Sequence, residues 1–350
     1  MENRIQLLEK IWPEKKSFRE KQFFEALFSQ NLKNFDEITV FPKDIRILMQ
    51  EKLTWLLWDT NKIFSGERGD THKAILSSIF DGAKIETVLM KNARGHWTIC
   101  VSSQVGCAMK CSFCATGSMG FIRNLNEDEI VDQYRFWKKY CDEKKLEGKI
   151  TNIVFMGMGE PLANYKSVKR SIDMFLSYAD IGATRITVST VGLLPMLEKI
   201  LTDKTWPNVR LAVSLHSADE KMRNLLMPSS YEGFLKKLSL WAKRYFEVYD
   251  QRRRHLTFEY VLLGGVNDTE IYAEKLLHFS RKLGKVRVNL IPYNATDTNF
   301  QPSQRIENFR EYLRQRGVVA TVRKSMGQDI AAACGQLVVN KKKNDDLYGK

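Results

Sequence analysis

Three cysteines stand close together in the sequence CAMKCSFC, at Cys107, Cys111 and Cys114. They directly follow TICVSSQVG, whose first residues are typical of a β-strand, so one loop would carry all three thiols. Three thiolates from one loop suit a cubane iron–sulfur cluster, because one iron is left free for an exogenous ligand. Structural zinc normally takes four protein ligands in paired spacing, and the sequence has no second Cys or His pair to match. We therefore expect these cysteines to ligate a 4Fe–4S cluster.

The CxxxCxxC spacing, with the aromatic Phe113 before the third cysteine, resembles the signature of the radical S-adenosylmethionine (radical SAM) superfamily. In that superfamily the methionine amino and carboxylate groups of SAM chelate the open iron. A second stretch, FMGMGEPL with Gly159 and Glu160, resembles the superfamily's GGE motif, which receives the methionine ammonium. Glycine suits this place because a backbone without a Cβ approaches a small ligand closely. Taken alone, the stretch would also fit a tight turn between a strand and a helix.

Further candidate SAM contacts lie where the third, fourth and sixth strands of the core should end. There, inward-pointing groups could contact the ribose, carboxylate and adenine of SAM. These candidates are Ser189, Ser214, Leu215, His216 and Asn294. Without the resemblance, Ser189 and Ser214 would be read as helix N-caps and His216 as a structural histidine.

The elements that must position these loops alternate along the chain. Short β-branched runs alternate with longer amphipathic stretches from Thr98 onward, which is typical of βα units on a parallel sheet. Six such units are too few for a closed eight-stranded barrel, so we expect an α/β fold with an open, partial (β/α)6 radical SAM barrel. The predicted strands are TICVS, NIVFM, RITVST, VRLAVSL, HLTFEYVLL and KVRVNLIPY, and a last strand, VVATVRK, follows them.

Two flanking regions complete the predicted organisation. Residues 1–85 have helical patterns such as FREKQFFEALFSQ, and we expect them to form a small helical accessory domain that binds RNA. The barrel would occupy 86–325. Residues 326–350 would form a C-terminal extension, in which Gly327 and Gly335 bracket an irregular loop before a basic tail.

Composition narrows the class of protein. The 350 residues include 55 Lys and Arg against 41 Asp and Glu, a net charge of +14, which favours a polyanionic partner such as RNA. No stretch approaches the length of about 18 apolar residues needed for a membrane span, and MENRIQLLEKIWPEKK lacks the apolar core of a signal peptide. We expect a cytoplasmic protein without a membrane partner.

The resemblance extends over nearly the whole chain to the RlmN/Cfr family of RNA adenine methyltransferases. Its most telling part is RKSMGQDIAAACGQL, which matches the family's C-terminal loop and its methyl-carrying cysteine, here Cys334. A second family cysteine precedes the first cluster ligand by seven residues, here Cys100, and the glutamate of IETV, here Glu86, is the family's proposed proton acceptor. Only Cys141 then lacks a role, and we expect it to be a packing residue.

The resemblance also implies a mechanism. Carbons 2 and 8 of adenine are electron-poor and do not attack the methyl group of SAM by polar displacement. In the family's scheme the Cys334 thiolate takes a methyl group first, and a 5′-deoxyadenosyl radical from a second SAM then removes hydrogen from it. The resulting radical adds to the base, Glu86 takes the ring proton, and Cys100 attacks Cys334 to release the RNA and leave a transient disulfide.

The implied partners follow from this scheme. They are 23S rRNA, tRNA, a flavodoxin-like one-electron reductase and a disulfide reductant, and we expect a monomer. A base within structured RNA must be splayed out and its backbone held by Lys and Arg. The candidate phosphate contacts are Arg123, Arg252, Arg253, Arg254, Arg323 and Lys324.

Two alternatives stay open at this point. One is Cfr-type methylation of carbon 8 of the adenine. Pro161 and the sequence FIRNL instead favour methylation of carbon 2. The other is a non-catalytic RNA-binding module in which Cys107, Cys111, Cys114 and Cys334 together form a four-cysteine metal site.

Overall fold

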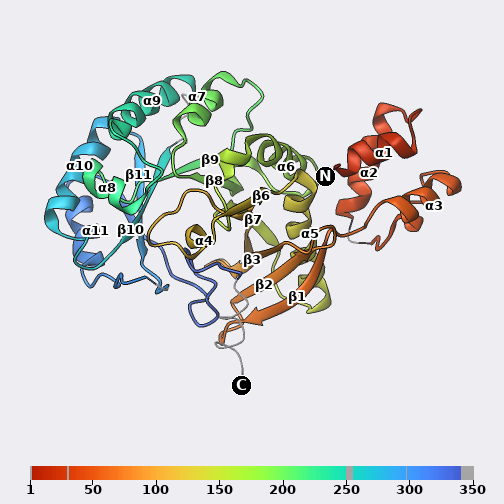
Figure 1. Ribbon diagram of the computed structural model, residues 1–350, viewed down its shortest axis with the longest axis horizontal. Coiled ribbons are helices and arrows are strands. Elements are labelled where there is room, and N and C mark those ends of the chain that lie inside the picture. The colour runs from red at the N-terminus through yellow and green to blue at the C-terminus, as the bar shows by residue number, and fades with distance from the viewer. Residues whose placement is uncertain (1, 30, 250–254, 297, 340–350) are drawn as a thin grey trace.

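The computed structural model describes residues 2–29, 31–249, 255–296 and 298–339. Within these ranges ten strands form the main sheet (Figure 1). They are β1 (Trp58–Ser65), β2 (Thr71–Ser78), β3 (Lys84–Lys91), β4 (Trp97–Cys100), β7 (Ile150–Phe155), β8 (Ile186–Thr190), β9 (Arg210–Ser214), β10 (Leu256–Leu262), β11 (Val286–Pro292) and β12 (Val319–Val322). A separate antiparallel pair consists of β5 (Gln104–Gly106) and β6 (Phe121–Asn124).

The main sheet combines two kinds of pairing. The strands lie side by side in chain order, and β1 to β4 pair antiparallel, whereas β4, β7, β8, β9, β10, β11 and β12 are all parallel. No pairing between β1 and β12 closes the sheet in the part of the chain that the structure describes. The predicted open barrel of six βα units is confirmed, since each predicted core strand is present and is followed by a helix.

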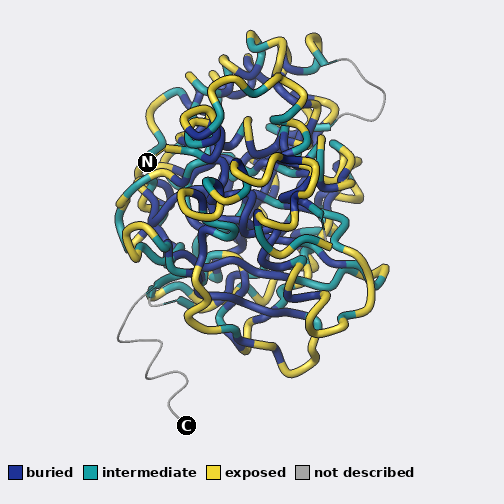
Figure 2. The backbone as a smooth tube through the Cα atoms, turned by 90° about the vertical axis from the view of Figure 1, so that its right-hand side faces the viewer, coloured by how far each residue is buried: buried dark blue, intermediate teal, exposed yellow. Residues whose placement is uncertain are grey.

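The helices cover the outside of the curved sheet (Figure 1). They are α5 (Glu127–Glu143), α6 (Tyr165–Tyr178), α7 (Leu194–Thr202), α8 (Glu220–Leu226), α9 (Phe234–Val248), α10 (Glu270–Leu283) and α11 (Ile306–Gln315). The short helix α4 (Ala115–Ser118) instead follows the loop of the three motif cysteines, near the centre of Figure 1. Buried backbone runs through the sheet and the inner faces of these helices, and exposed residues lie on the outside (Figure 2). Cys141 is 8% exposed within this core, which confirms it as a packing residue.

The N-terminal region differs from its prediction. It begins with α1 (Arg4–Ile11), α2 (Ser17–Phe28) and α3 (Lys43–Lys52), but the helical prediction is wrong beyond Lys52, because β1 and β2 follow. Nearly all of β2 is buried, including polar and charged residues, so the strand lacks the apolar–polar alternation by which strands are recognised. The domain boundaries at 85 and 325 stay predictions, and 340–350 of the expected extension lie outside the described residues.

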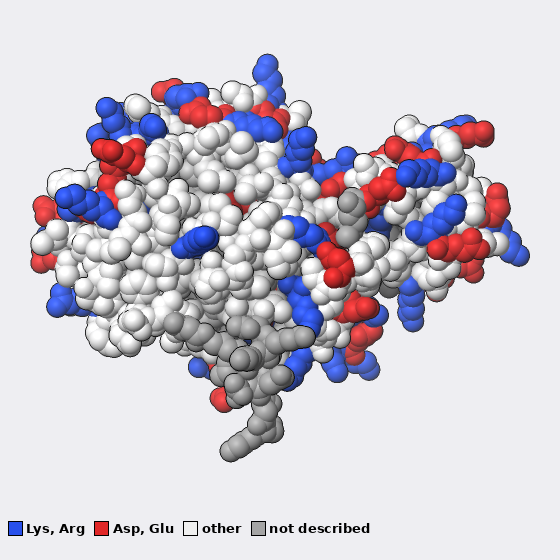
Figure 3. Space-filling view, in the orientation of Figure 1, with Lys and Arg blue, Asp and Glu red and all other residues white. Residues whose placement is uncertain are grey.

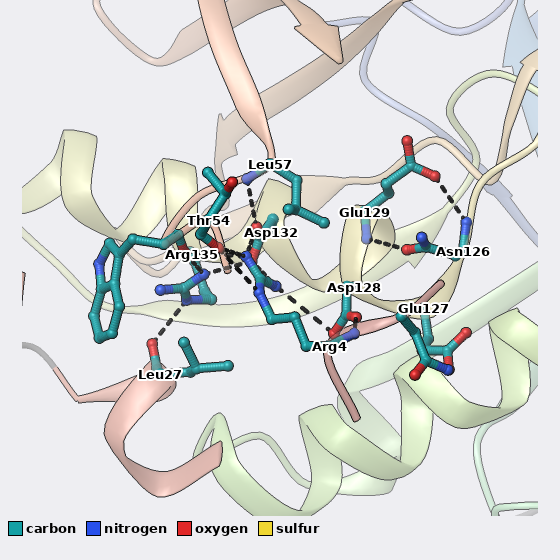
Figure 4. Close-up of polar contacts among 12 residues, drawn as sticks. Arg4, Leu27, Thr54, Leu57, Asn126, Glu127, Asp128, Glu129, Asp132 and Arg135 are labelled. Atoms are coloured by element: carbon teal, nitrogen blue, oxygen red, sulfur yellow. Dashed lines mark hydrogen bonds and ion pairs between the residues drawn. The ribbon is translucent and has the colours of Figure 1, made fainter. Parts of the chain in front are cut away.

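Four buried charged side chains join the N-terminal helices to the barrel (Figure 4). This interdomain ion cluster consists of Arg4 of α1 and Asp128, Asp132 and Arg135 of α5. Both guanidinium groups contact the Asp132 carboxylate. The distance to it is 2.5 Å from Arg4 Nη2 and 2.6 Å from Arg135 Nη1. The guanidinium groups also donate to backbone carbonyls, among them Thr54 at 3.0 Å. Burial alone would raise the pKa of Asp132, but the two guanidinium groups hold it below its usual value.

Candidate active site at the carboxyl ends of the strands

The three motif cysteines lie in the loop between β5 and α4, at the carboxyl-end edge of the parallel strands. Backbone hydrogen bonds fix this loop: Cys107 N donates to Gly120 O at 2.8 Å, and Ser112 N donates to Leu226 O at 2.9 Å. Cys107, Cys111 and Cys114 all line one cavity of about 160 Å³. The structure therefore brings the three predicted ligands to a single cavity, as a loop-bound cluster requires.

The chemistry of these thiols fits an iron–sulfur cluster. Burial raises the pKa of the Cys107 thiol to about 11 and also raises the pKa values of Cys111 and Cys114. Three thiolates in such a place need bound cations to share their charge. Three soft thiol donors that line one cavity suit a 4Fe–4S cluster.

Gly159 and Glu160 follow β7 and line the same cavity. Gly159 has a φ of +99°, and a Cβ there would lie 2.5 Å from the Cβ of Gln104, so glycine is required by close packing against β5. Glu160 is 2% exposed, and its carboxylate accepts hydrogen bonds from Leu162 N at 2.9 Å and Val191 N at 2.8 Å. Burial nevertheless raises the pKa of Glu160 to about 7, so a cationic ligand such as an ammonium group would stabilise its carboxylate.

Three of the other expected SAM contacts also line this cavity: Ser189, Ser214 and His216. The two serine Oγ atoms are 3.4 Å apart. His216 Nδ1 accepts a hydrogen bond from Val261 N at 3.0 Å, and burial lowers the pKa of the ring to about 3, so the imidazole is neutral. His216 thus has the backbone contact expected of a structural histidine as well as its place in the cavity.

Two expected SAM contacts lie elsewhere. Leu215 is fully buried behind the cavity, where its backbone pairs with Glu259 and Arg223. Asn294 follows β11 and contacts the C-terminal loop, since its Nδ2 donates to Cys334 O at 3.1 Å. In this structure, Asn294 therefore positions the loop that bears Cys334.

The C-terminal loop, residues 326–339, is held over the cavity by contacts to several elements. Ala115 N donates to Gly335 O at 2.8 Å, and Thr116 Oγ1 donates to Leu337 O at 2.6 Å. These two bonds tie the loop to α4, directly after the cluster cysteines. We call residues 326–339 the carrier loop.

Cys334 on the carrier loop lies between the other reactive thiols. It lines the 160 Å³ cavity together with Cys114, and it lines an adjoining cavity of about 40 Å³ together with Cys100. Arg323, just after β12, lines both cavities. Cys334 is exposed, whereas Cys100 is 6% exposed and burial raises the pKa of its thiol to about 12.

Glu86 lies on β3 beneath the carrier loop and is completely buried. Its Oε2 accepts a hydrogen bond from Val338 N at 3.1 Å, and its Oε1 lies 3.3 Å from Lys73 Nζ on β2. Burial raises the pKa of Glu86 to about 7, while the Lys73 ammonium opposes this rise. The carboxyl group is therefore poised to gain or lose a proton near neutral pH.

Some site residues were missed from the sequence. Lys73 on β2 and Glu259 on β10 are buried charged side chains, and Glu259 lines the cavity 3.4 Å from Arg323. Glu259 stands in the mostly apolar run LTFEYVL, and a charge in such a run is a signal that could have found it. Lys73 stands in THKAILSS, where the neighbouring polar residues give no such signal. Arg223 of α8 is also buried, and it donates to backbone carbonyls beside the cavity.

The expected phosphate contacts find mixed support. Arg123 pairs with Asp81 at 2.6 Å and Glu129 at 2.9 Å, so two carboxylates already hold its guanidinium group. Arg323 faces the cavity, and Arg252, Arg253 and Arg254 lie outside the described residues. Figure 3 shows Lys and Arg side chains interspersed with Asp and Glu around the edge of one face, with few charges at its centre. No described helix is long and apolar enough to cross a membrane.

Comparisons with known proteins agree with this geometry. The model of the radical SAM superfamily matches residues 101–276. A probable dual-specificity RNA methyltransferase RlmN of Prochlorococcus marinus is 40% identical over 331 residues, which is 92% of this chain and 89% of the relative. The dual-specificity RNA methyltransferase RlmN of Buchnera aphidicola is 38% identical over 337 residues, 94% of this chain and 91% of the relative.

A solved structure extends the agreement to three dimensions. The crystal structure of a radical SAM methyltransferase from Sphaerobacter thermophilus is 38% identical, covers 95% of this chain and 96% of its own, and has a TM-score of 0.85. The superfamily match spans half of the chain, and the RlmN relatives match nearly all of it. The chain therefore belongs to the RlmN family of radical SAM RNA methyltransferases.

Proposed function

We propose that the protein methylates carbon 2 of an adenine in 23S rRNA and in tRNA, with Cys334 carrying the transferred carbon. Family membership supports RNA methylation by a radical SAM enzyme, and the names of the relatives as dual-specificity enzymes are consistent with two RNA substrates. One observation carries the proposal: Cys334 borders the cavity of the cluster cysteines on one side and the cavity of Cys100 on the other.

Each group of residues has a separate task. Cys107, Cys111 and Cys114 hold the cluster, and the lining that includes Glu160 receives SAM. When bound, the 4Fe–4S cluster and SAM supply the one-electron hydrogen abstraction that no amino-acid side chain provides. The protein's own residues accept the methyl group, hold the base and move its proton.

Cys334 is suited to accept and transfer carbon. Its side chain is exposed, and the Arg323 guanidinium group faces it across the shared lining. Burial alone would lower the pKa of Arg323, but Cys334 and Glu259 raise it, so the guanidinium group stays charged beside the thiol. The thiolate is the form of cysteine that attacks a methyl sulfonium, and the Arg323 guanidinium group is placed to pair with its negative charge.

Cys100 is suited to act last. Its buried thiol has a pKa of about 12 in this state, so it is protonated and unreactive while Cys334 is being methylated. Once the carbon–carbon bond exists, the Cys100 sulfur gives up its proton and attacks the Cys334 sulfur. The bond from the Cys334 sulfur to the transferred carbon breaks, and that carbon takes up a proton to complete the methyl group of the released RNA. A disulfide remains, and a cellular reductant must restore both thiols.

Glu86 is the candidate acceptor of the ring proton. A carboxyl group with a pKa of about 7 can take up and release a proton near neutral pH. Glu86 lies under the carrier loop, and Val338 N contacts it directly. The adenine attached to Cys334 would therefore reach the Glu86 carboxylate only after the carrier loop shifts, as mobile active-site loops do.

The experiment is product analysis with reconstituted protein. We would load the cluster anaerobically, incubate the protein with SAM, reductant and 23S rRNA or tRNA, and identify the methylated nucleosides by mass spectrometry against standards. The proposal predicts 2-methyladenosine and an EPR spectrum that changes when SAM is added. The 8-methyl isomer would support the Cfr-type alternative, and a protein without a SAM-sensitive cluster would contradict radical SAM chemistry.

A further inference from the structure

Lys73 is a buried lysine to which the proposed chemistry gives no task. It lies on β2 and is 2% exposed. Its Nζ is 3.3 Å from Glu86 Oε1 on β3 and donates a hydrogen bond to Ala331 O of the carrier loop at 3.2 Å. The ring of Phe64 on β1 lies 5.3 Å from the ammonium group. One side chain thus joins the candidate base to the loop that bears Cys334.

A buried ammonium group is costly, so its position calls for an explanation. Removing a lysine from water costs several kcal/mol, and a buried ion pair often stabilises a protein no more than apolar residues of the same size would. Fold stability alone therefore gives little reason for Lys73 and Glu86 to face each other here. Their contacts to the carrier loop indicate a functional reason.

We propose that Lys73 is a positioning residue, whose ammonium group favours the carboxylate form of Glu86 and anchors the carrier loop above it. This inference rests on the proposed function, because it takes Glu86 to be the acceptor of the ring proton. Lys73 itself lines neither of the two cavities that Cys334 borders. It acts through Glu86 and through the backbone of Ala331.

The proposed effect of Lys73 on the protonation of Glu86 depends on which groups face this carboxyl group. The Lys73 ammonium faces it from β2, and the Val338 N–H faces it from the carrier loop. Ser102 and Met158 contact only the backbone of Glu86. Lys73 is thus the one charged side chain placed against this carboxyl group among the described residues. Its loss should raise the pKa of Glu86 by about 1–3 units, the usual effect of an opposite charge at this distance.

The proposed anchoring of the carrier loop by Lys73 depends on the hydrogen bonds that hold this loop. Ala331 has a φ of +49° and lies three residues before Cys334, so its carbonyl is directed by an unusual backbone conformation. The loop is bonded to the N-terminal strands at a second point, where Glu67 N donates to Asp329 Oδ2 at 2.8 Å. Loss of the Lys73 contact would weaken the docking at Ala331 while leaving the contacts of Gly335 and Leu337 to α4.

The test is the pH dependence of methylation by Lys73→Met protein with a loaded cluster. Single-turnover formation of methylated adenosine is measured from pH 6 to pH 9, alongside formation of 5′-deoxyadenosine, which precedes proton transfer. We expect the acidic limb of the methylation profile to move up by about 1–3 pH units. At pH 7 this lowers the rate by about fivefold or more, while formation of 5′-deoxyadenosine is unchanged.

Lys62→Met is the matched control. Lys62 lies on β1, is exposed, and has its ammonium group 4.9 Å from the same Phe64 ring. This substitution makes the same change in charge, so its profile should superimpose on that of the wild type. Hydrogen exchange gives a readout that does not depend on activity. The amide of Val338 should exchange faster in the Lys73→Met protein at pH 7, because a protonated Glu86 is a weaker acceptor.

The Lys73→Met experiments can contradict the inference directly. A Lys73→Met protein with the wild-type pH profile and wild-type exchange at Val338 would overturn the inference. If that variant does not fold, Lys73→Gln removes the charge but keeps a donor for Ala331 O, and the same shift of the acidic limb is expected. A wild-type protein that forms no methylated adenosine at any pH would instead overturn the proposed function, while the exchange result would still decide whether Lys73 favours the carboxylate form of Glu86.

Discussion

Asp132 and Glu86 are both completely buried carboxyl groups, but the protein surrounds them differently. Asp132 faces two guanidinium groups, from Arg4 and Arg135, and accepts a further hydrogen bond from Leu57 N at 2.8 Å. Glu86 faces one ammonium group and one backbone N–H. As a result, the pKa of Asp132 lies below its usual value and that of Glu86 is raised to about 7.

Because the pKa values of Asp132 and Glu86 are shifted in opposite directions, their contributions to the free energy of unfolding depend on pH in opposite ways. Asp132 has a lowered pKa in the folded protein, so it contributes stability above its unfolded value of 3.8, and this contribution is lost as the pH falls. Glu86 has a raised pKa, so its contribution is full below its unfolded value of 4.5 and is lost as the pH rises through about 7. The first carboxyl group is fully paired and holds two regions together, whereas the second is underpaired and available for proton transfer.

The largest expected effect separates chemistry from folding at Cys334. Cys334→Ala should abolish methylated product and leave the iron content normal, because in the proposed function this sulfur carries carbon and does not ligate the cluster. The side chain is exposed, so the free energy of unfolding should change by less than about 0.5 kcal/mol. Iron analysis, product analysis and denaturant unfolding check this. A loss of iron together with activity would instead support the alternative of a four-cysteine metal site.

The next effect concerns the interdomain ion cluster. Asp132→Asn should lower the free energy of unfolding by about 3–5 kcal/mol, because it leaves two buried guanidinium groups without their carboxylate. The matched control on the same helix is Glu143→Gln, which breaks an exposed pair with Lys139 and should cost about 0.5 kcal/mol or less. Equal effects of the two substitutions would contradict a structural role for the cluster.

A smaller effect on stability is expected when the buried charges of both Lys73 and Glu86 are removed. The Lys73→Met/Glu86→Gln double variant should be as stable as the wild type at pH 7, or more stable by about 1–4 kcal/mol, and should form no methylated product. Its stability should also lack the loss that Glu86 causes between pH 4.5 and about 7. Denaturant unfolding at both ends of this range checks the sign, and a double variant that is several kcal/mol less stable would show that the pair holds the fold.

The sequence predicted the parallel core well because both of its signals are local. Apolar β-branched runs gave the strands, and the spacing of Cys107, Cys111 and Cys114 gave the cluster loop. The antiparallel strands β1 and β2 form a local hairpin, and they were missed because β2 carries buried polar residues and so lacks the alternation typical of a strand. Lys73 was missed because its burial depends on contacts to Glu86 and to Ala331, which lies 258 residues away in the sequence.

The sequence brought candidate residues together correctly where their neighbours are fixed by strand order, and their contact with SAM stays a prediction. Ser189 and Ser214 meet because β8 and β9 are adjacent and parallel, with their carboxyl ends at one edge. Asn294 and Leu215 lie outside the cavity of the cluster cysteines, because their surroundings depend on how the carrier loop and α8 pack. Such packing has no signal in the spacing of the residues.

The most direct test of the account is the fate of RNA on Cys100→Ala protein, since Cys100 is needed only after the carbon–carbon bond exists. With cluster, SAM and reductant supplied, RNA should stay covalently attached to Cys334, as a band that survives SDS and disappears with RNase. The Cys100→Ala/Cys334→Ala protein should show no such band, and Cys141→Ala should turn over like the wild type. Normal turnover by Cys100→Ala without an adduct would contradict the assignment of Cys100 as the thiol that releases RNA from Cys334.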